Sequence, residues 1–252
     1  MSAAGLDITW NPPTMRYSLR RFASLIAITF CVASLSITSS ASAVEGTELN
    51  GSIGLWGVFL PDANDSTSSA SGDSIGTIMS LAGHHRFSGY RTSAEGGITY
   101  GVTDDVQMLG YEALLRDTWS FGQHDLSAGF GYSQMDWDQD FGQGELSTTY
   151  QGAKVVAGWE TFFGHRPMWL DFSLGLYDLD GEYDNAGVIE GTVGGFTTTY
   201  GLELKTEGTI GNVATRTIFG IDYLSDITSL HDGVVGTDDG LTLSAVFEFR
   251  LF

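Results

Sequence analysis

The chain has 252 residues, of which 42% are hydrophobic, and its 31 acidic against 11 basic residues give a formal charge of −20. A surface this acidic repels phosphate, so we expect no nucleic-acid partner. The single cysteine, Cys31, excludes a disulfide within one chain.

The first 43 residues have the pattern of an export signal. Arg16, Arg20 and Arg21 precede an apolar run over 22–37, which ends near the small triplet Ala41-Ser42-Ala43. This run is shorter than the roughly 20 residues of a membrane-spanning helix. We therefore predict a secretory signal peptide over 1–43, with Met15 as an alternative start, and a mature domain over 44–252.

The mature domain reads as a series of strands. No segment of it has 18 uninterrupted apolar residues; instead, short stretches alternate apolar and polar side chains with period two. This pattern predicts an all-β fold: a closed antiparallel transmembrane β-barrel of ten strands, with eight or twelve as alternatives. The predicted strands are 49–60, 75–85, 90–102, 106–116, 124–135, 148–162, 168–178, 196–206, 213–224 and 240–251.

The connections fit a barrel that alternates short inner turns with longer outer loops. If the first strand leaves the periplasm, the inner turns fall at 86–89, 117–123, 163–167 and 207–212. The outer loops then fall at 61–74, 103–105, 136–147, 179–195 and 225–239. All but the second of these loops are longer than any inner turn.

Six of the predicted strands carry one acidic and one basic residue, both on the parity opposite the apolar set. In a barrel this parity faces the lumen, where an uncompensated charge is costly, so we expect ion pairs across strands. A soluble sandwich would show the same alternation but explains neither the signal nor the last strand. The predicted lumen charges are the twelve residues of these six strands and Asp171 of a seventh: Arg91, Glu95, Glu112, Arg116, Lys154, Glu160, Asp171, Glu203, Lys205, Arg216, Asp222, Glu248 and Arg250.

The predicted outer loops are rich in Asp and Glu and hold no Lys or Arg. We expect them to form an acidic, cation-attracting outer mouth around Asp136, Asp138, Asp140, Asp178, Asp180, Glu182 and Asp184. Such carboxylates could gather the oxygens that calcium takes, but the glycine and terminal glutamate of an EF-hand are missing. We expect no cofactor, with calcium in these loops as the weaker alternative.

The final stretch, Leu241 to Phe252, alternates apolar residues with Thr242, Ser244, Glu248 and Arg250. A terminal amphipathic strand ending in Phe resembles the closing strand of Gram-negative outer-membrane β-barrels. The resemblance implies a place in the outer membrane, contact with its lipid, and recognition of this stretch by the barrel-assembly machinery. Phe252 departs from the family pattern because it falls on the polar parity.

Three functions remain open. Tyr150-Gln151-Gly152 and Thr199-Tyr200-Gly201-Leu202-Glu203 resemble the major-outer-membrane-protein type of pore-forming family, which implies a narrow, passive, porin-like channel. The alternative is a non-conducting structural or surface-interaction barrel, like the small OmpA-type barrels, whose ion-paired lumen is plugged. Less favoured is an outer-membrane enzyme that uses His231-Asp232, since some ten-stranded outer-membrane proteases carry an Asp-His pair. We therefore expect no enzymatic activity.

Overall fold

The computed structural model describes residues 46–60, 63–64, 69–70, 73–141, 144–163, 166–185, 188–210, 213–231 and 234–251. The predicted signal peptide, Cys31 and Phe252 lie outside the described residues. The described part of the chain contains no helix long and apolar enough to cross a membrane.

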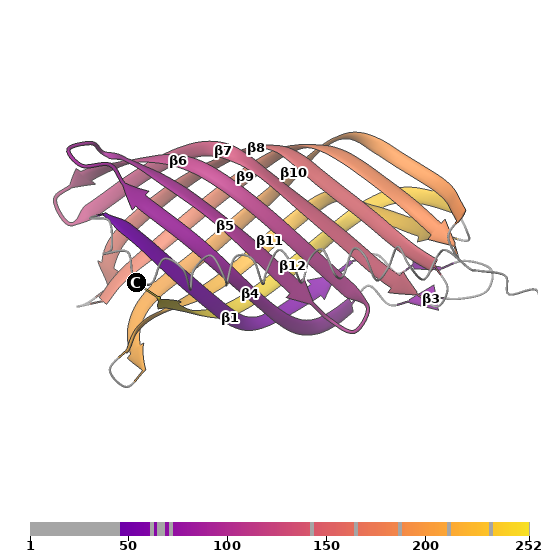
Figure 1. Ribbon diagram of the computed structural model, residues 1–252, viewed down its shortest axis with the longest axis horizontal. Helices are drawn as coiled ribbons and strands as arrows, with labels where there is room; N and C mark the ends of the chain where they lie inside the picture. Colours follow the sequence, from indigo (N-terminus) through magenta and orange to yellow (C-terminus); the bar gives the residue numbers. More distant parts are fainter. Residues whose placement is uncertain are drawn as a thin grey trace, which may run out of the picture.

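The described residues form strands joined by short turns (Figure 1). Their bounds are β1 (Thr47–Phe59), β2 (Ala63–Asn64), β3 (Ser69–Ala70), β4 (Asp73–Arg86), β5 (Thr92–Val102), β6 (Val106–Phe121), β7 (His124–Phe141), β8 (Gly144–Phe163), β9 (Arg166–Asn185), β10 (Val188–Ile210), β11 (Val213–His231) and β12 (Val234–Arg250).

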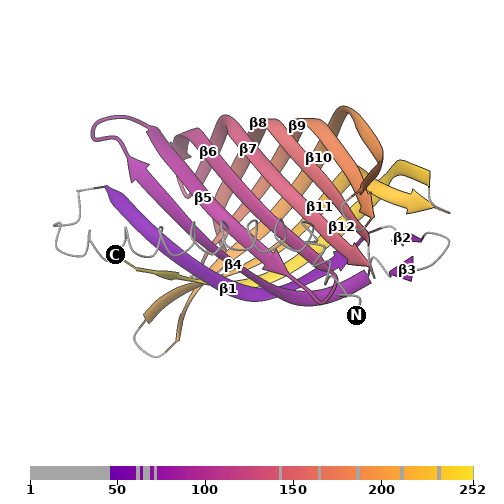
Figure 2. The same cartoon turned by 45° about the vertical axis from the view of Figure 1, so that its right-hand side comes forward.

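Ten of these strands close into an antiparallel barrel in the order β1-β12-β11-β10-β9-β8-β7-β6-β5-β4, while β2 and β3 pair with each other. Closure comes from the pairing of the first and last strands, in which Asn50 lies opposite Arg250 and Phe59 opposite Leu241. Figure 2 shows the strands tilted around a common axis. The predicted all-β closed barrel of ten strands is confirmed. We call the end where β1 begins the inner end and the end where it finishes the outer end.

The strands alternate as expected for a barrel in lipid. On β7, Phe130 and Tyr132 face outward and are 67% and 51% exposed. Ser133, the next residue along the strand, faces inward and is 4% exposed. Apolar side chains outside and small or polar ones inside match a wall that contacts hydrocarbon.

Several strands are much longer than a bilayer needs. β8 and β9 have 20 residues each and β10 has 23, whereas about 9–11 residues span the hydrocarbon. The excess lies at the outer end, where the predicted loops 136–147, 179–195 and 225–239 are wrong: strands continue through most of them. Among the described residues, for example, β7 continues to Phe141 and β8 begins at Gly144.

The polarity of the wall inverts along these extensions. Up to Leu176 the apolar side chains of β9 face outward, but Tyr177 and Leu179, at 1% and 4% exposed, face inward. Asp178 and Asp180 then take the outward positions and are exposed. Since only the bilayer requires an apolar exterior, the inversion marks the level at which the wall leaves the membrane.

Candidate functional site

The inner half of the lumen contains a cavity of ≈ 470 Å³, the inner chamber, which is lined by residues of all ten barrel strands. A second cavity of ≈ 210 Å³, the middle chamber, lies further along the lumen. Together they are lined by every predicted lumen charge except Arg250, which binds Glu48 at the inner rim with an Nη1–Oε1 distance of 3.2 Å.

A chain of ion pairs crosses the inner chamber. Arg116 binds Glu95 at 3.0 Å and Asp171 at 3.0 Å. Asp171 also accepts a bond from Lys205 at 2.8 Å, and Lys205 reaches Glu203 at 2.9 Å. Each member of the Arg116–Asp171–Lys205 core is mostly removed from solvent, with side-chain exposures of 14%, 16% and 21%. Two cations and three carboxylates thus neutralise most of each other's charge, as a lumen of low dielectric requires.

A glycine lets Arg116 reach across two strands to Asp171. Arg116 lies on β6 and Asp171 on β9, with β7 and β8 between them. A Cβ added at Gly158 on β8 would lie 3.0 Å from Arg116 Nη1 and would collide with Asp171 Oδ1 and Ser127 Oγ. The absence of a side chain at Gly158 is therefore what leaves room for the pair.

Further pairs line the remaining wall. Lys154 Nζ lies 2.7 Å from Glu112 Oε2, and Arg216 Nη1 lies 2.7 Å from Glu248 Oε1. The guanidinium of Arg216 also stacks over Trp169 at 4.8 Å from the ring centroid. The lumen charges that the sequence predicted are thus brought together mainly as pairs, in the way a neutral interior demands.

Beyond the middle chamber, apolar side chains close the lumen. Trp56 of β1 meets Trp137 of β7, with ring centroids 5.5 Å apart, although β4, β5 and β6 separate these strands in the barrel. Trp56 lies on Gly101 of β5, where an added Cβ would come within 2.7 Å of the indole ring. We call the whole cluster the seal; it comprises Trp56, Val58, Leu60, Val106, Met108, Trp137, Tyr150, Tyr177, Leu179, Leu224 and Ile227.

Burial at this level extends around the barrel. All eleven side chains of the seal are at most 8% exposed, and two inward residues on β10 and β12, Thr197 at 3% and Thr242 at 4%, are equally buried. Tyr177 contributes a polar contact, because its hydroxyl lies 2.5 Å from Ser133 Oγ. Packed apolar side chains exclude water from such a constriction.

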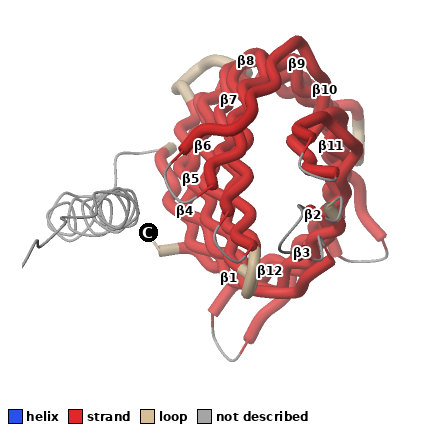
Figure 3. The backbone as a smooth tube through the Cα atoms, turned by 90° about the vertical axis from the view of Figure 1, so that its right-hand side faces the viewer, coloured by secondary structure: helices blue, strands red, loops and turns tan. Residues whose placement is uncertain are grey.

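The outer part of β11 lies inside the barrel and completes the closure (Figure 3). The amide N–H of Thr228 donates to Thr148 Oγ1 at 3.2 Å, although β9 and β10 separate β11 from β8 in the wall. Leu230 packs with Leu146 and Tyr183, and Val235 of β12 covers them. We call Asp226–His231 together with Val234–Asp238 the inner hairpin, because it lies inside the barrel, although at the outer end.

The contact between the inner hairpin and the wall also buries polar atoms. Among the described residues, five atoms at this level have no hydrogen-bond partner: Trp137 Nε1, Gln139 Nε2, Tyr150 Oη, Thr228 Oγ1 and Ser229 Oγ. An unsatisfied buried polar group costs about 1–3 kcal/mol. The closed arrangement therefore combines favourable apolar packing with a polar penalty.

The seven predicted mouth carboxylates do not face the lumen. They lie on the outward face of the β7 and β9 extensions, in cross-strand rows that place Asp136 opposite Thr149 and Asp138 opposite Ser147. In the next register step, Thr149 and Ser147 lie opposite Asp180 and Glu182. We call this surface the acidic wall; its seven residues are Asp136, Asp138, Asp140, Asp178, Asp180, Glu182 and Asp184.

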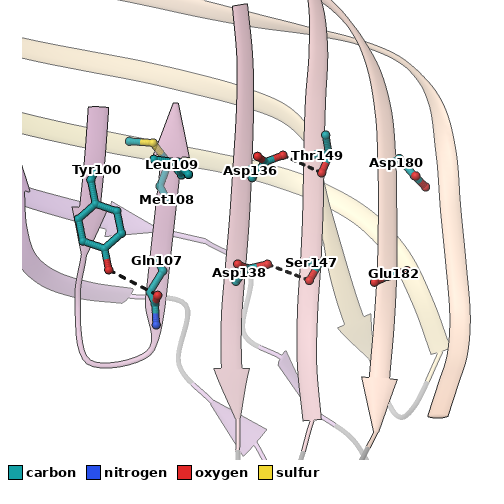
Figure 4. Close-up of a pocket in the computed structure, with 10 residues that line it drawn as sticks. All are labelled: Tyr100, Gln107, Met108, Leu109, Asp136, Asp138, Ser147, Thr149, Asp180 and Glu182. Atoms are coloured by element: carbon teal, nitrogen blue, oxygen red, sulfur yellow. Dashed lines mark hydrogen bonds between the residues drawn. The ribbon is translucent and has the colours of Figure 1, made fainter. Parts of the chain in front are cut away.

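The hydroxyls of β8 separate the carboxylates of the two flanking strands. Thr149 Oγ1 donates to Asp136 at 2.9 Å and Ser147 Oγ donates to Asp138 at 2.8 Å (Figure 4). Because neighbouring strands are about 4.8 Å apart, the β7 and β9 carboxylates are held about 10 Å from one another. No group of three or more His, Cys, Asp or Glu residues within the described segments could hold a metal ion.

The sequence did not single out the seal or the inner hairpin. Asp232 lies outside the described residues, and so does the side chain of His231. A signal for the seal was present in the order of residues 174–183, where the apolar parity changes between Leu176 and Tyr177. The inward course of β11 has no comparable local signal, because it depends on contacts with β8 and β9.

Comparisons with known proteins bear on the fold alone. No family model and no curated protein matches the chain. It is similar in structure to the translocator domain of the autotransporter NalP from Neisseria meningitidis, with a TM-score of 0.46 and 9% identity over 92% of this chain and 96% of that one. It is also similar to Neisserial surface protein A, with a TM-score of 0.31 and 13% identity over 81% of this chain and 99% of that one.

A third similar structure is Ail of Yersinia pestis, in complex with the heparin analogue sucrose octasulfate. Its TM-score is 0.25, and the 12% identity covers 81% of this chain and 99% of that one. These structures are Gram-negative outer-membrane β-barrels. At such low identity they add nothing about a ligand or an activity.

Proposed function

We propose that this protein is a Gram-negative outer-membrane barrel whose lumen is closed in its resting state and which presents the acidic wall to the outside. The observation that carries this proposal is the seal, in which Trp56 and Trp137 from opposite walls meet over the lumen. An open passive porin needs a continuous water-filled path, and small barrels are commonly filled by their own side chains. The proposal thus favours the surface-interaction or structural barrel over the narrow channel.

The outward apolar belt supports a place in lipid, and the paired first and last strands leave no free barrel edge. We place the outer end outside the cell because it carries the long strand extensions, and the longer connections of such barrels are extracellular. The terminal stretch Leu241 to Phe252 is then the segment that the assembly machinery would recognise.

The acidic wall is the part of this barrel that meets other molecules. Its carboxylates project outward above the membrane level, where they attract cationic groups within about a Debye length, ~8 Å at physiological salt. No enzymatic activity and no cofactor form part of the proposal.

Thiol labelling in oriented lipid vesicles tests the closure. In a Cys31→Ser background, Ser120→Cys places a thiol at an exposed position on the inner chamber and Asp138→Cys places one on the acidic wall. With the outer end facing the bath, a charged, membrane-impermeant thiol reagent should modify Asp138→Cys quickly and Ser120→Cys far more slowly. Equal rates at the two positions would show an open lumen and refute the proposed function.

A further inference from the structure

The inner hairpin is attached to the barrel wall through a distinct bend. The pairing of β11 with β12 shifts register between Leu224 and Ile227, and Asp226, at φ 60°, is the non-glycine residue with positive φ in the described part of the chain. A left-handed conformation at a residue other than glycine carries strain and persists only where the surroundings hold it. The bend therefore has the character of a hinge.

Polar contacts hold the bend in its inward position. Thr197 Oγ1 on β10 lies 2.6 Å from the carbonyl oxygen of Ser225 and 3.0 Å from Asp226 Oδ2. Thr237 Oγ1 on β12 donates to the other carboxylate oxygen of Asp226 at 3.4 Å. These bonds connect the hinge to both of its neighbouring strands.

The inward and outward positions of the hairpin are stabilised by opposing contributions. Leaving the lumen would cost Ile227, Leu230 and Val235 their apolar contacts with the wall. It would also give water to Thr228 Oγ1 and Ser229 Oγ, which are buried without partners on the inside. Such compensation is what an element with two accessible positions requires.

The hairpin also bears directly on the seal. Ile227 belongs to the same buried cluster as Trp56 and Trp137, so its withdrawal removes one side chain from the packing of the seal. We propose that the inner hairpin is a hinged plug that swings out at Ser225–Asp226 and so admits water and small ions from the outer side. This inference rests on the proposed function, since only a closed lumen has a plug to release.

A cross-link between hairpin and wall provides the first test. Thr148→Cys/Thr228→Cys in a Cys31→Ser background would tie the hairpin inside, because Thr228 N and Thr148 Oγ1 are already 3.2 Å apart. The matched control, Ser229→Cys/Gly236→Cys, joins register partners within the hairpin and leaves the hinge free. A Cβ at Gly236 would lie 3.8 Å from Ser229 Oγ, so these two positions face each other.

The readout is single-channel recording in planar bilayers. The wild type should be closed most of the time, with brief openings. Oxidation of Thr148→Cys/Thr228→Cys should reduce the frequency of openings at least about tenfold. This corresponds to destabilising the open state relative to the closed state by about 1.4 kcal/mol. Dithiothreitol should restore them, and the control pair should respond to neither treatment. Openings that persist unchanged in the oxidised cross-linked protein would overturn the plug.

A steric variant tests the plug without altering the hairpin. A Cβ at Gly181 on β9 would collide with Thr228 Oγ1 and lie 2.9 Å from Val193, whereas one at Gly195 would meet nothing within 4 Å. Gly181→Ala should therefore raise the open fraction several-fold and Gly195→Ala should leave it unchanged. If the wild type is steadily open, the proposed function fails. If the wild type is closed and Gly181→Ala does not open it, the proposed function stands and the plug is refuted.

Discussion

Replacing Asp171 by Asn tests whether the ion pairs in the lumen stabilise the fold. Asp171 holds two cations at once, Arg116 at 3.0 Å and Lys205 at 2.8 Å, and the three side chains are between 14% and 21% exposed. Removing one member of a buried pair costs about 3–5 kcal/mol. Because Arg116 keeps Glu95 and Lys205 keeps Glu203, we expect the lower end, about 3 kcal/mol.

Urea titration of the protein folded in lipid vesicles, followed by tryptophan fluorescence, measures this loss in the free energy of unfolding. The control is Glu48→Gln, which breaks the rim pair with Arg250, whose side chains are 41% and 57% exposed. An exposed pair contributes about 0–1 kcal/mol. A loss for Asp171→Asn no greater than that for Glu48→Gln would refute the reasoning.

Two further predictions concern the barrel wall. Phe130→Arg, at a 67% exposed outward position, should lower the free energy of unfolding by about 2–4 kcal/mol in the same titration. Thr118→Arg, directed into the inner chamber, should lower it by at most about 1 kcal/mol. Equal losses would mean that the two faces are misassigned. Gly158→Ala should cost about 1–3 kcal/mol, because its Cβ meets the Arg116–Asp171 pair, while Gly208→Ala, whose nearest neighbour is 3.9 Å away, should change stability by less than about 0.5 kcal/mol. A harmless Gly158→Ala would show that the pair does not need this space.

The membrane-embedded part of the fold could be predicted from sequence because lipid imposes a simple local rule. Outward apolar and inward polar residues alternate, so each strand carries its own signal. The rule also placed charges such as Arg116 and Asp171 on the lumen parity. It could not give their partners, since contact across β7 and β8 depends on a gap at Gly158 and not on spacing along a strand.

Above the membrane the same rule fails. The extensions have an apolar interior and a polar exterior, like a soluble β-protein. The membrane rule therefore predicts loops at Asp136 and Asp180, which belong to strands. Their placement outside the wall follows from parity only if the strands continue. The inward hairpin was beyond prediction because its position depends on distant contacts, such as that between Thr228 and Thr148.

The most direct test of the closed lumen is the time-averaged conductance of many wild-type molecules in a planar bilayer. The seal predicts an average conductance close to the lipid background, together with a clear increase in Trp56→Ala/Trp137→Ala, which removes the two rings that meet 5.5 Å apart over the lumen. Trp159→Ala, at a 42% exposed position, is the matched control and should remain closed. A large, steady conductance in the wild type, unchanged in the double variant, would contradict the account.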